Sequence, residues 1–158
     1  MSDKRQRLKG RKTSGSFMQI PHAVIEHENY SRLSHRARSL LWDLYSQFRG
    51  KNNGDLCAAM SIMKRKGWKS NDQLSKAKKE LLETGWIVRT KIGGLRIGPD
   101  LFAITFKPID ECGGKLDCKE TSVALGYWKL GHNPELNPPH RNTVQTAPPH
   151  GTATKIIA

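Results

Sequence analysis

The stretch from Gly67 to Phe106 constrains the fold of this chain most strongly, because two periodicities follow each other there in a fixed order. Residues 70–83 carry apolar side chains at helical spacing. Two short apolar stretches, 86–91 and 101–106, come next and are separated by a glycine-rich loop. β-branched and aromatic residues favour strands, and loop glycines favour chain reversal, so the two stretches are expected to pair as a hairpin. This order predicts a mixed α+β domain.

The helix in this stretch has clear signals at both ends. Ser70 and Gln73 form an S-x-x-Q capping box, which marks a helix N-terminus. Gly85 is expected to stop the helix. Its inner stripe consists of Leu74, Ala77, Leu81 and Leu82. At about 100 degrees per residue, the remaining polar side chains point away from this stripe, so one face is predicted to pack and the other to meet solvent.

A second amphipathic helix is predicted further upstream. Ser34 can cap it, and Gly50 is expected at its C′ position. Its apolar face consists of Ala37, Leu40, Leu41, Leu44, Tyr45 and Phe48. A turn at 52–54, a short strand at 56–58 and a compact helix at 59–66 then lead to the next glycine. The compact helix, with Met60 and Met63 expected to point inward, and the helix from Ser70 have the spacing of a helix-turn-helix pair.

Helix-turn-helix, strand, glycine loop and strand are the parts of a winged helix, in which a hairpin wing lies beside a groove-binding helix. The predicted fold is therefore α+β, a winged helix-turn-helix with a three-helix core, a β-hairpin wing and flexible N- and C-terminal tails. The alternative for the hairpin is that it only packs on the helices.

Charge and composition divide the chain into four parts. Residues 1–16 form a basic flexible arm, with six basic side chains and one acid in the first twelve residues. Residues 17–111 are assigned to the winged-helix domain and residues 112–130 to a C-terminal extension. Residues 131–158 are rich in proline and short polar residues and are expected to be disordered. The apolar segment 122–130 packs on the body or joins two subunits as a homodimer, and its Tyr127 and Trp128 favour packing.

The overall charge indicates a polyanionic partner. Lys and Arg number 27 against 14 Asp and Glu, a formal net charge of +13. Such an excess favours nucleic acid first and an anionic membrane surface second. No apolar run reaches the roughly 18 residues of a membrane span, and the basic N-terminus lacks the apolar core of a secretory signal. A cytoplasmic protein is expected.

The sequence carries no recognisable catalytic or cofactor motif. Cys57, Cys112 and Cys118 form no CxxC pair, and the histidines lack metal-ligand spacing, so no metal site is predicted and the thiols are expected to be reduced. The carboxylates form no cluster suited to two-metal hydrolysis, and the glycines fit neither a P-loop nor a dinucleotide motif. The sequence predicts no cofactor and no enzymatic activity.

The candidate nucleic-acid contacts gather on the polar face of the helix from Ser70. Asn71, Gln73 and Lys76 are types that can meet base edges, whereas Lys69 and Lys79 suit phosphates. The remaining candidates come from the helix start, the hairpin and the arm: Ser70, Ser75, Arg89, Lys91, Arg96, Lys4, Arg5 and Arg7. An ordinary solvated helix face and a solubilising arm are the alternatives.

Four segments carry a resemblance to a known family: LSHRARSLLWDLY, GKNNGDL, KRKGWKSNDQLSKAKKELLETGWIVRTKIGG and LFAITFKPID. They resemble small winged-helix proteins of bacterial prophages and mobile elements, which are similar to the DNA-binding domains of plasmid and phage replication initiators and of several regulators. The resemblance covers residues 17–111. It implies that the exposed part of residues 69–79 enters a DNA groove, that residues 89–97 act as the wing, and that the protein acts in the bacterial cell near the nucleoid.

The expected function is non-enzymatic binding of double-stranded DNA, as a transcription regulator or a replication accessory of phage type. Two alternatives stay open on the same fold. One is RNA binding, although no strand carries the aromatic pattern of common RNA-binding sheets. The other is a protein-interaction adaptor whose helix face binds a host or replication protein, as an inhibitor of a host defence or polymerase would.

Overall fold

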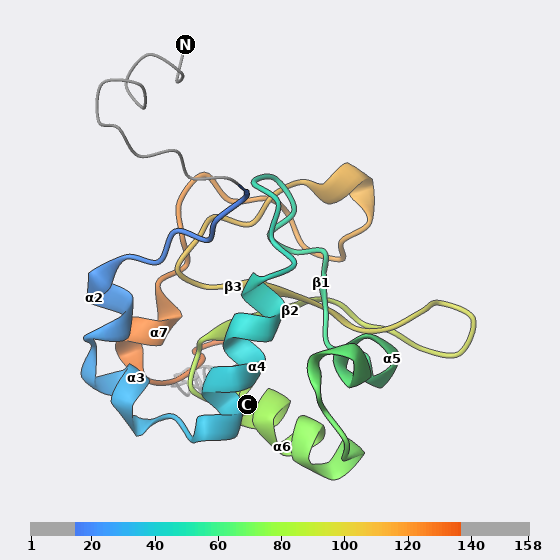
Figure 1. Cartoon of the computed structure of the whole chain (residues 1–158). Coiled ribbons are helices and arrows are strands. Elements are labelled where there is room, and N and C mark those ends of the chain that lie inside the picture. Colours follow the sequence, from blue (N-terminus) through green and yellow to red (C-terminus); the bar gives the residue numbers. More distant parts are fainter. Residues whose placement is uncertain (1–14, 137–158) are drawn as a thin grey trace, which may run out of the picture.

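The computed structural model describes residues 15–136 as a mixed α+β fold, as predicted (Figure 1). Residues 1–14 and 137–158 lie outside the described part, and with them the candidates Lys4, Arg5 and Arg7. Within the described residues there are six α-helices and one three-stranded sheet. The α-helices are α2 (His22–Ile25), α3 (Glu28–Arg32), α4 (His35–Tyr45), α5 (Met60–Met63), α6 (Asn71–Glu83) and α7 (Tyr127–Leu130). The strands are β1 (Leu56–Cys57), β2 (Ile87–Lys91) and β3 (Leu101–Ile104), and short 3-10 turns occur at η1 (Lys64–Lys66) and η2 (Cys112–Gly114).

The sheet confirms the predicted hairpin. Strand order is β1-β3-β2, and both pairings are antiparallel. Ile87 lies opposite Ile104, and the register shifts between Arg89 and Lys91. All four residues of β3 are buried, because the strand is central in the sheet.

Helices α4 and α6 bury most of the apolar stripes that the sequence predicts. Two members differ: Leu82 is half-buried, and Phe48 is half-buried beyond the end of α4. Leu40, Leu41, Leu44 and Leu81 are all 0% exposed. Ser34 caps α4 by accepting a hydrogen bond from the Ala37 N–H at 3.2 Å, and Ser70 caps α6 by accepting from the Gln73 N–H at 3.3 Å. Glu80 of α6 accepts hydrogen bonds from Ser34 N–H and Oγ at 2.7 and 2.6 Å. These bonds join the C-terminal part of α6 to the N-terminus of α4.

The predicted end of the upstream helix is wrong. Helix α4 ends at Tyr45, with Ser46 as its C-cap, whereas Gly50 at the C′ position would place the last helical residue at Phe48. The physical reason is a contact with the sheet: Gln47 Nε2 donates to Cys57 O at 2.9 Å, and Gln47 Oε1 accepts from Cys57 N–H at 3.0 Å. Gln47 therefore extends the edge of β1 instead of continuing the helix. Gly50 does have a positive φ of 102°, but in the following loop.

The predicted helix at 59–66 is divided into α5 and the 3-10 turn η1. Met63 is fully buried, whereas Met60 is half-buried. Gly67 ends the element with a φ of 96°, as the sequence predicts. The division matters because η1 carries Lys64, Arg65 and Lys66, whose side chains are exposed.

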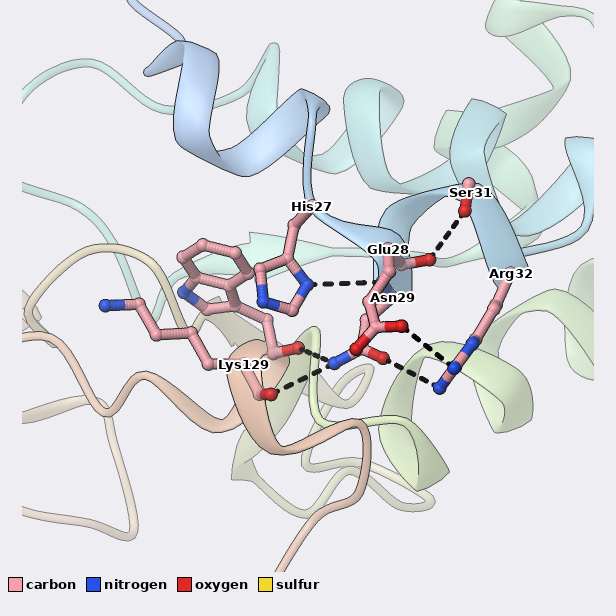
Figure 2. A network of polar contacts seen from close by, with 7 residues as sticks. His27, Glu28, Asn29, Ser31, Arg32 and Lys129 are labelled. Atoms are coloured by element: carbon pink, nitrogen blue, oxygen red, sulfur yellow. Dashed lines mark hydrogen bonds and ion pairs between the residues drawn. The ribbon is translucent and has the colours of Figure 1, made fainter.

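The C-terminal segment packs on the body, as its aromatic residues predict. Trp128 is 5% exposed, and its ring centroid lies 5.5 Å from that of Trp86. Asn29 Nδ2 donates to the carbonyls of Trp128 and Lys129, both at 3.0 Å (Figure 2). In Figure 1, α7 accordingly lies beside α2 and α3.

The expectation that order is lost from residue 131 is wrong for residues 131–136. Asn133 is 2% exposed, and its N–H donates to Glu83 O at 2.9 Å. The last turn of α6 thereby gains a partner from the C-terminal segment. The rest of the Pro-rich tail lies outside the described residues.

Replacing Asn29 with alanine is expected to lower the free energy of unfolding by about 1–3 kcal/mol, because two carbonyls of α7 lose their buried donor. Trypsin cleavage after the exposed Lys129 should also become faster, since local opening of α7 costs less free energy. Urea unfolding and limited proteolysis measure the two effects. Ser31→Ala is the matched control, because the Ser31 hydroxyl bonds only to Glu28 O within α3. An equal loss in both variants would contradict the role assigned to Asn29.

Candidate nucleic-acid interface

Helix α6 presents its polar face to solvent, as predicted. The candidates Asn71, Gln73, Ser75, Lys76 and Lys79 are all exposed. Ser70 is half-buried, and its oxygen already accepts the cap hydrogen bond from Gln73 N–H. Its role is therefore to start the helix, and only its hydroxyl proton remains to be donated to a ligand.

Two of the candidate lysines on α6 form ion pairs one helical turn away. Lys76 Nζ lies 2.8 Å from Asp72 Oδ2, and Lys79 Nζ lies 3.8 Å from Glu83 Oε1. Each side chain in these pairs is more than half exposed. Exposed pairs of this kind contribute at most about 1 kcal/mol, so a phosphate can replace the carboxylate as partner.

The turn before α6 adds cations that the sequence reasoning missed. Lys64, Arg65 and Lys66 form η1, at the C-terminal end of α5, where cations are favourable. With Lys69 they surround the turn, and residues 64–79 contain seven cations and a single acid, Asp72. Six of these seven side chains are exposed, and Lys78 is half-buried. The signal that could have found this cluster was the run KRKGWK itself.

An open depression of about 360 Å³ joins this turn to α4. Its cations are Arg36 from α4, Lys66 from η1 and Lys69 from the turn, and Gln73 of α6 also lines it. The depression brings together two predicted contacts, Lys69 and Gln73, with Arg36, which is not among the predicted contacts. The turn itself is held by Trp68, whose Nε1 donates to Asp43 Oδ2 at 2.8 Å.

A second depression, of about 280 Å³, lies where the base of the hairpin meets α6. It brings together Ser75, Lys78 and Lys79 of α6 with Arg89 of β2. Arg89 Nε lies 3.5 Å from Asp100 Oδ2, which partly neutralises its charge. The structure therefore brings Arg89 to the candidate helix face, as a paired cation.

The two other hairpin candidates lie further from α6. Lys91 is half-buried at the end of β2. Arg96 is exposed at the tip of the hairpin, with a positive φ of 68°. Figure 1 shows that this hairpin projects beyond the body of the molecule. Arg96 lines neither of the two depressions.

Comparison with protein-family models, curated proteins and solved structures found no match. Among residues 15–136, no helix combines the length and the apolar character needed to cross a bilayer. The same residues contain no group of three or more His, Cys, Asp or Glu side chains that could hold a metal ion.

The cysteines are free thiols outside this interface. Cys57 is buried in β1, Cys112 is half-buried and Cys118 is exposed. Partial burial raises the pKa of the Cys112 thiol, and the nearby carboxylates Asp55 and Asp110 raise it further. Partial burial also raises the pKa of Cys118. Neither thiol is activated as a nucleophile, because activation requires a lowered pKa.

Proposed function

We propose that the protein binds double-stranded DNA, without catalysing a reaction, as a winged helix-turn-helix protein. In this proposal α5 with η1 and α6 form the helix-turn-helix pair, and the β2–β3 hairpin is the wing. One observation carries the proposal. Residues 64–79 form a band with six exposed cations and a single acid, and the first turn of α6, within this band, carries the side-chain amides of Asn71 and Gln73. A surface of this charge pattern favours a polyanion.

The dimensions of α6 favour a nucleic-acid groove over a flat surface as its binding site. A helix of 13 residues is about 20 Å long, and a helix with its side chains is about 10–12 Å across. The major groove of B-DNA is about 12 Å wide, whereas that of A-form RNA is too narrow for side chains to read. Asn71, Gln73 and Lys76 would then meet base edges, while Lys69 and Arg36 would meet the phosphates on one side.

The proposed cellular role follows from the resemblance to winged-helix proteins of prophages and mobile elements. It is that of a transcription regulator or a replication accessory, acting in the bacterial cytoplasm near the nucleoid. The compact cation band is compatible with either role, because both require binding to one duplex site. Genomic neighbours would distinguish them: adjacent replication genes favour the accessory, and a divergent promoter favours the regulator.

The experiment that tests the proposal is a salt titration of binding to a fluorescein-labelled 30-bp duplex, followed by anisotropy. The logarithm of the binding constant should fall with the logarithm of the salt concentration with a slope of about −4 to −6, as expected for five or six phosphate contacts. Duplex RNA of the same length should compete more weakly at equal salt. Failure to bind the DNA near physiological salt would overturn the proposal, and stronger competition by RNA would replace DNA with RNA as the ligand.

Asp72→Asn tests the proposal through an expected gain, rather than a loss, of affinity for the duplex. The change removes the only acid of the 64–79 band and releases Lys76, so affinity for the duplex is expected to rise by about 3-fold to 5-fold. Asp55→Asn is the matched control, because it removes the same charge and also breaks a lysine pair, that of Asp55 Oδ2 with Lys115 Nζ at 2.7 Å. This control should leave affinity within about 1.5-fold, because Asp55 lies outside the band. Equal gains in both variants would mean that only net charge matters.

A further inference from the structure

The tip of the β2–β3 hairpin exposes large apolar side chains that the fold does not use. Leu95 is 92% exposed and Ile97 is 61% exposed, on either side of Arg96. Ile92, at the start of the loop, is 65% exposed. The strand pairing and the buried side chains of β2 and β3 lie nearer the body, so these side chains contribute nothing to the core. A cluster of exposed apolar side chains usually marks a surface that is covered by a ligand.

Backbone hydrogen bonds close the tip of the hairpin. Gly94 N–H donates to Gly98 O at 2.9 Å, and Gly98 N–H donates back to Gly94 O at 3.2 Å. Two carboxylates hold the base: Asp100 accepts from Gly93 N–H at 2.7 Å, and Asp117 accepts from Ile92 N–H at 2.8 Å. A side chain at Gly93 would come within 2.5 Å of the opposite arm of the loop. The apolar side chains are thus presented on a preformed support, which lowers the entropic cost of binding.

We propose that this tip enters the minor groove of the bound duplex and inserts Leu95 or Ile97 as a wedge against a base step, which bends the DNA. This inference rests on the proposed DNA binding. Leucine and isoleucine side chains cannot donate hydrogen bonds to phosphates, so they would add no affinity to a wing that contacts only the DNA backbone. Apolar side chains do add affinity where they contact the faces of partly unstacked bases. Arg96 is the only charged residue between Ile92 and Pro99, and the negative potential of a narrow minor groove attracts it.

The length of the hairpin suits this placement. Arg89 lies beside α6 at the base of the hairpin, and Leu95 lies six positions further along the chain. At about 3.3 Å per residue, the arm reaches roughly 20 Å. Adjacent groove centres in B-DNA lie about 17 Å apart, half of the 34 Å repeat. With α6 in the major groove, the tip can therefore reach the neighbouring minor groove.

The test uses the full chain and a 30-bp duplex with dyes at its ends and 2-aminopurine placed in turn at successive A·T pairs. Binding should raise energy transfer between the ends, and it should raise 2-aminopurine fluorescence by about 2-fold to 5-fold at one step, as a base loses its neighbour. Leu95→Ala with Ile97→Ala should abolish both signals, while the salt slope stays unchanged and affinity falls by less than about 10-fold. Arg96→Ala should reduce the slope by about 0.9.

Val123→Ala is the matched control, since Val123 is 71% exposed in a loop outside the hairpin, and it should keep both signals. Binding by the parent chain without a bend, or a bend kept by the double variant, would overturn the wedge and leave the proposed DNA binding intact. A dimer of the parent chain that the double variant dissociates, measured by sedimentation, would make the tip an interface between two copies instead. Absence of any duplex binding would overturn both proposals together, and the salt titration identifies that case.

Discussion

Replacing Trp86 with alanine is expected to lower the free energy of unfolding by about 3–5 kcal/mol, the largest stability effect of any single change proposed for this protein. Trp86 is 0% exposed and lies between two other aromatic residues. Its ring centroid is 5.9 Å from that of Tyr30 and 5.5 Å from that of Trp128. The indole therefore joins α3, the start of β2 and α7, and its loss leaves a cavity where three segments of the chain meet. Urea unfolding followed by circular dichroism at 222 nm measures the change.

Trp86→Phe is the control that separates ring packing from hydrogen bonding. The Trp86 Nε1 is buried without a hydrogen-bond partner in the described part of the chain. Phenylalanine keeps one aromatic ring and removes this unsatisfied donor, so a loss of only about 1–2 kcal/mol is expected. A loss as large as that of the alanine variant would show that the indole N–H has a partner, and that packing is not the main contribution.

Removing three cations of the turn, Lys64, Arg65 and Lys69, is expected to weaken duplex binding by roughly 100-fold at physiological salt. The salt slope should become shallower by about 2.7, since each phosphate contact contributes about 0.9. All three side chains are exposed, so their replacement by alanine should change the free energy of unfolding by less than about 0.5 kcal/mol each. Anisotropy titrations at several salt concentrations measure both quantities.

A second triple variant controls for net charge. Lys51, Lys119 and Lys129 are exposed and lie outside the 64–79 band. Their replacement by alanine removes the same charge, and the expected loss of affinity is less than about 3-fold, because charges more than a Debye length from a phosphate are screened. If both triples lose affinity equally, the protein binds DNA through its overall charge, and the proposed interface is wrong.

Most of the local structure of this protein could be predicted, because its signals lie within a few residues of each other. The caps at Ser34 and Ser70 and the helix ends at Gly67 and Gly85 depend on backbone groups at most four positions away. The buried stripe of α6 follows from its 3.6-residue period. The hairpin follows from two apolar stretches around a glycine loop.

The errors and omissions occur where distant segments decide the outcome. Helix α4 ends early because Gln47 bonds to Cys57 in β1. The C-terminal segment stays packed beyond residue 130 because the buried Asn133 donates its N–H to Glu83 O at the end of α6, 50 positions earlier in the chain. Arg36 lies beside the turn before α6 only because α4 packs against α6. None of these contacts leaves a periodic pattern or a capping motif in the sequence, so they cannot be predicted from one segment at a time.

The sequence by itself determined the α+β class, the polar face of α6 and the excess of positive charge, because these depend on composition and on short-range geometry. Only the tertiary structure decided which cations share a surface, which are already paired, as Arg89 is with Asp100, and which apolar side chains remain uncovered at the hairpin tip. The physical reason is that charge and hydrophobicity belong to each residue, whereas pairing and exposure depend on segments that meet only after folding.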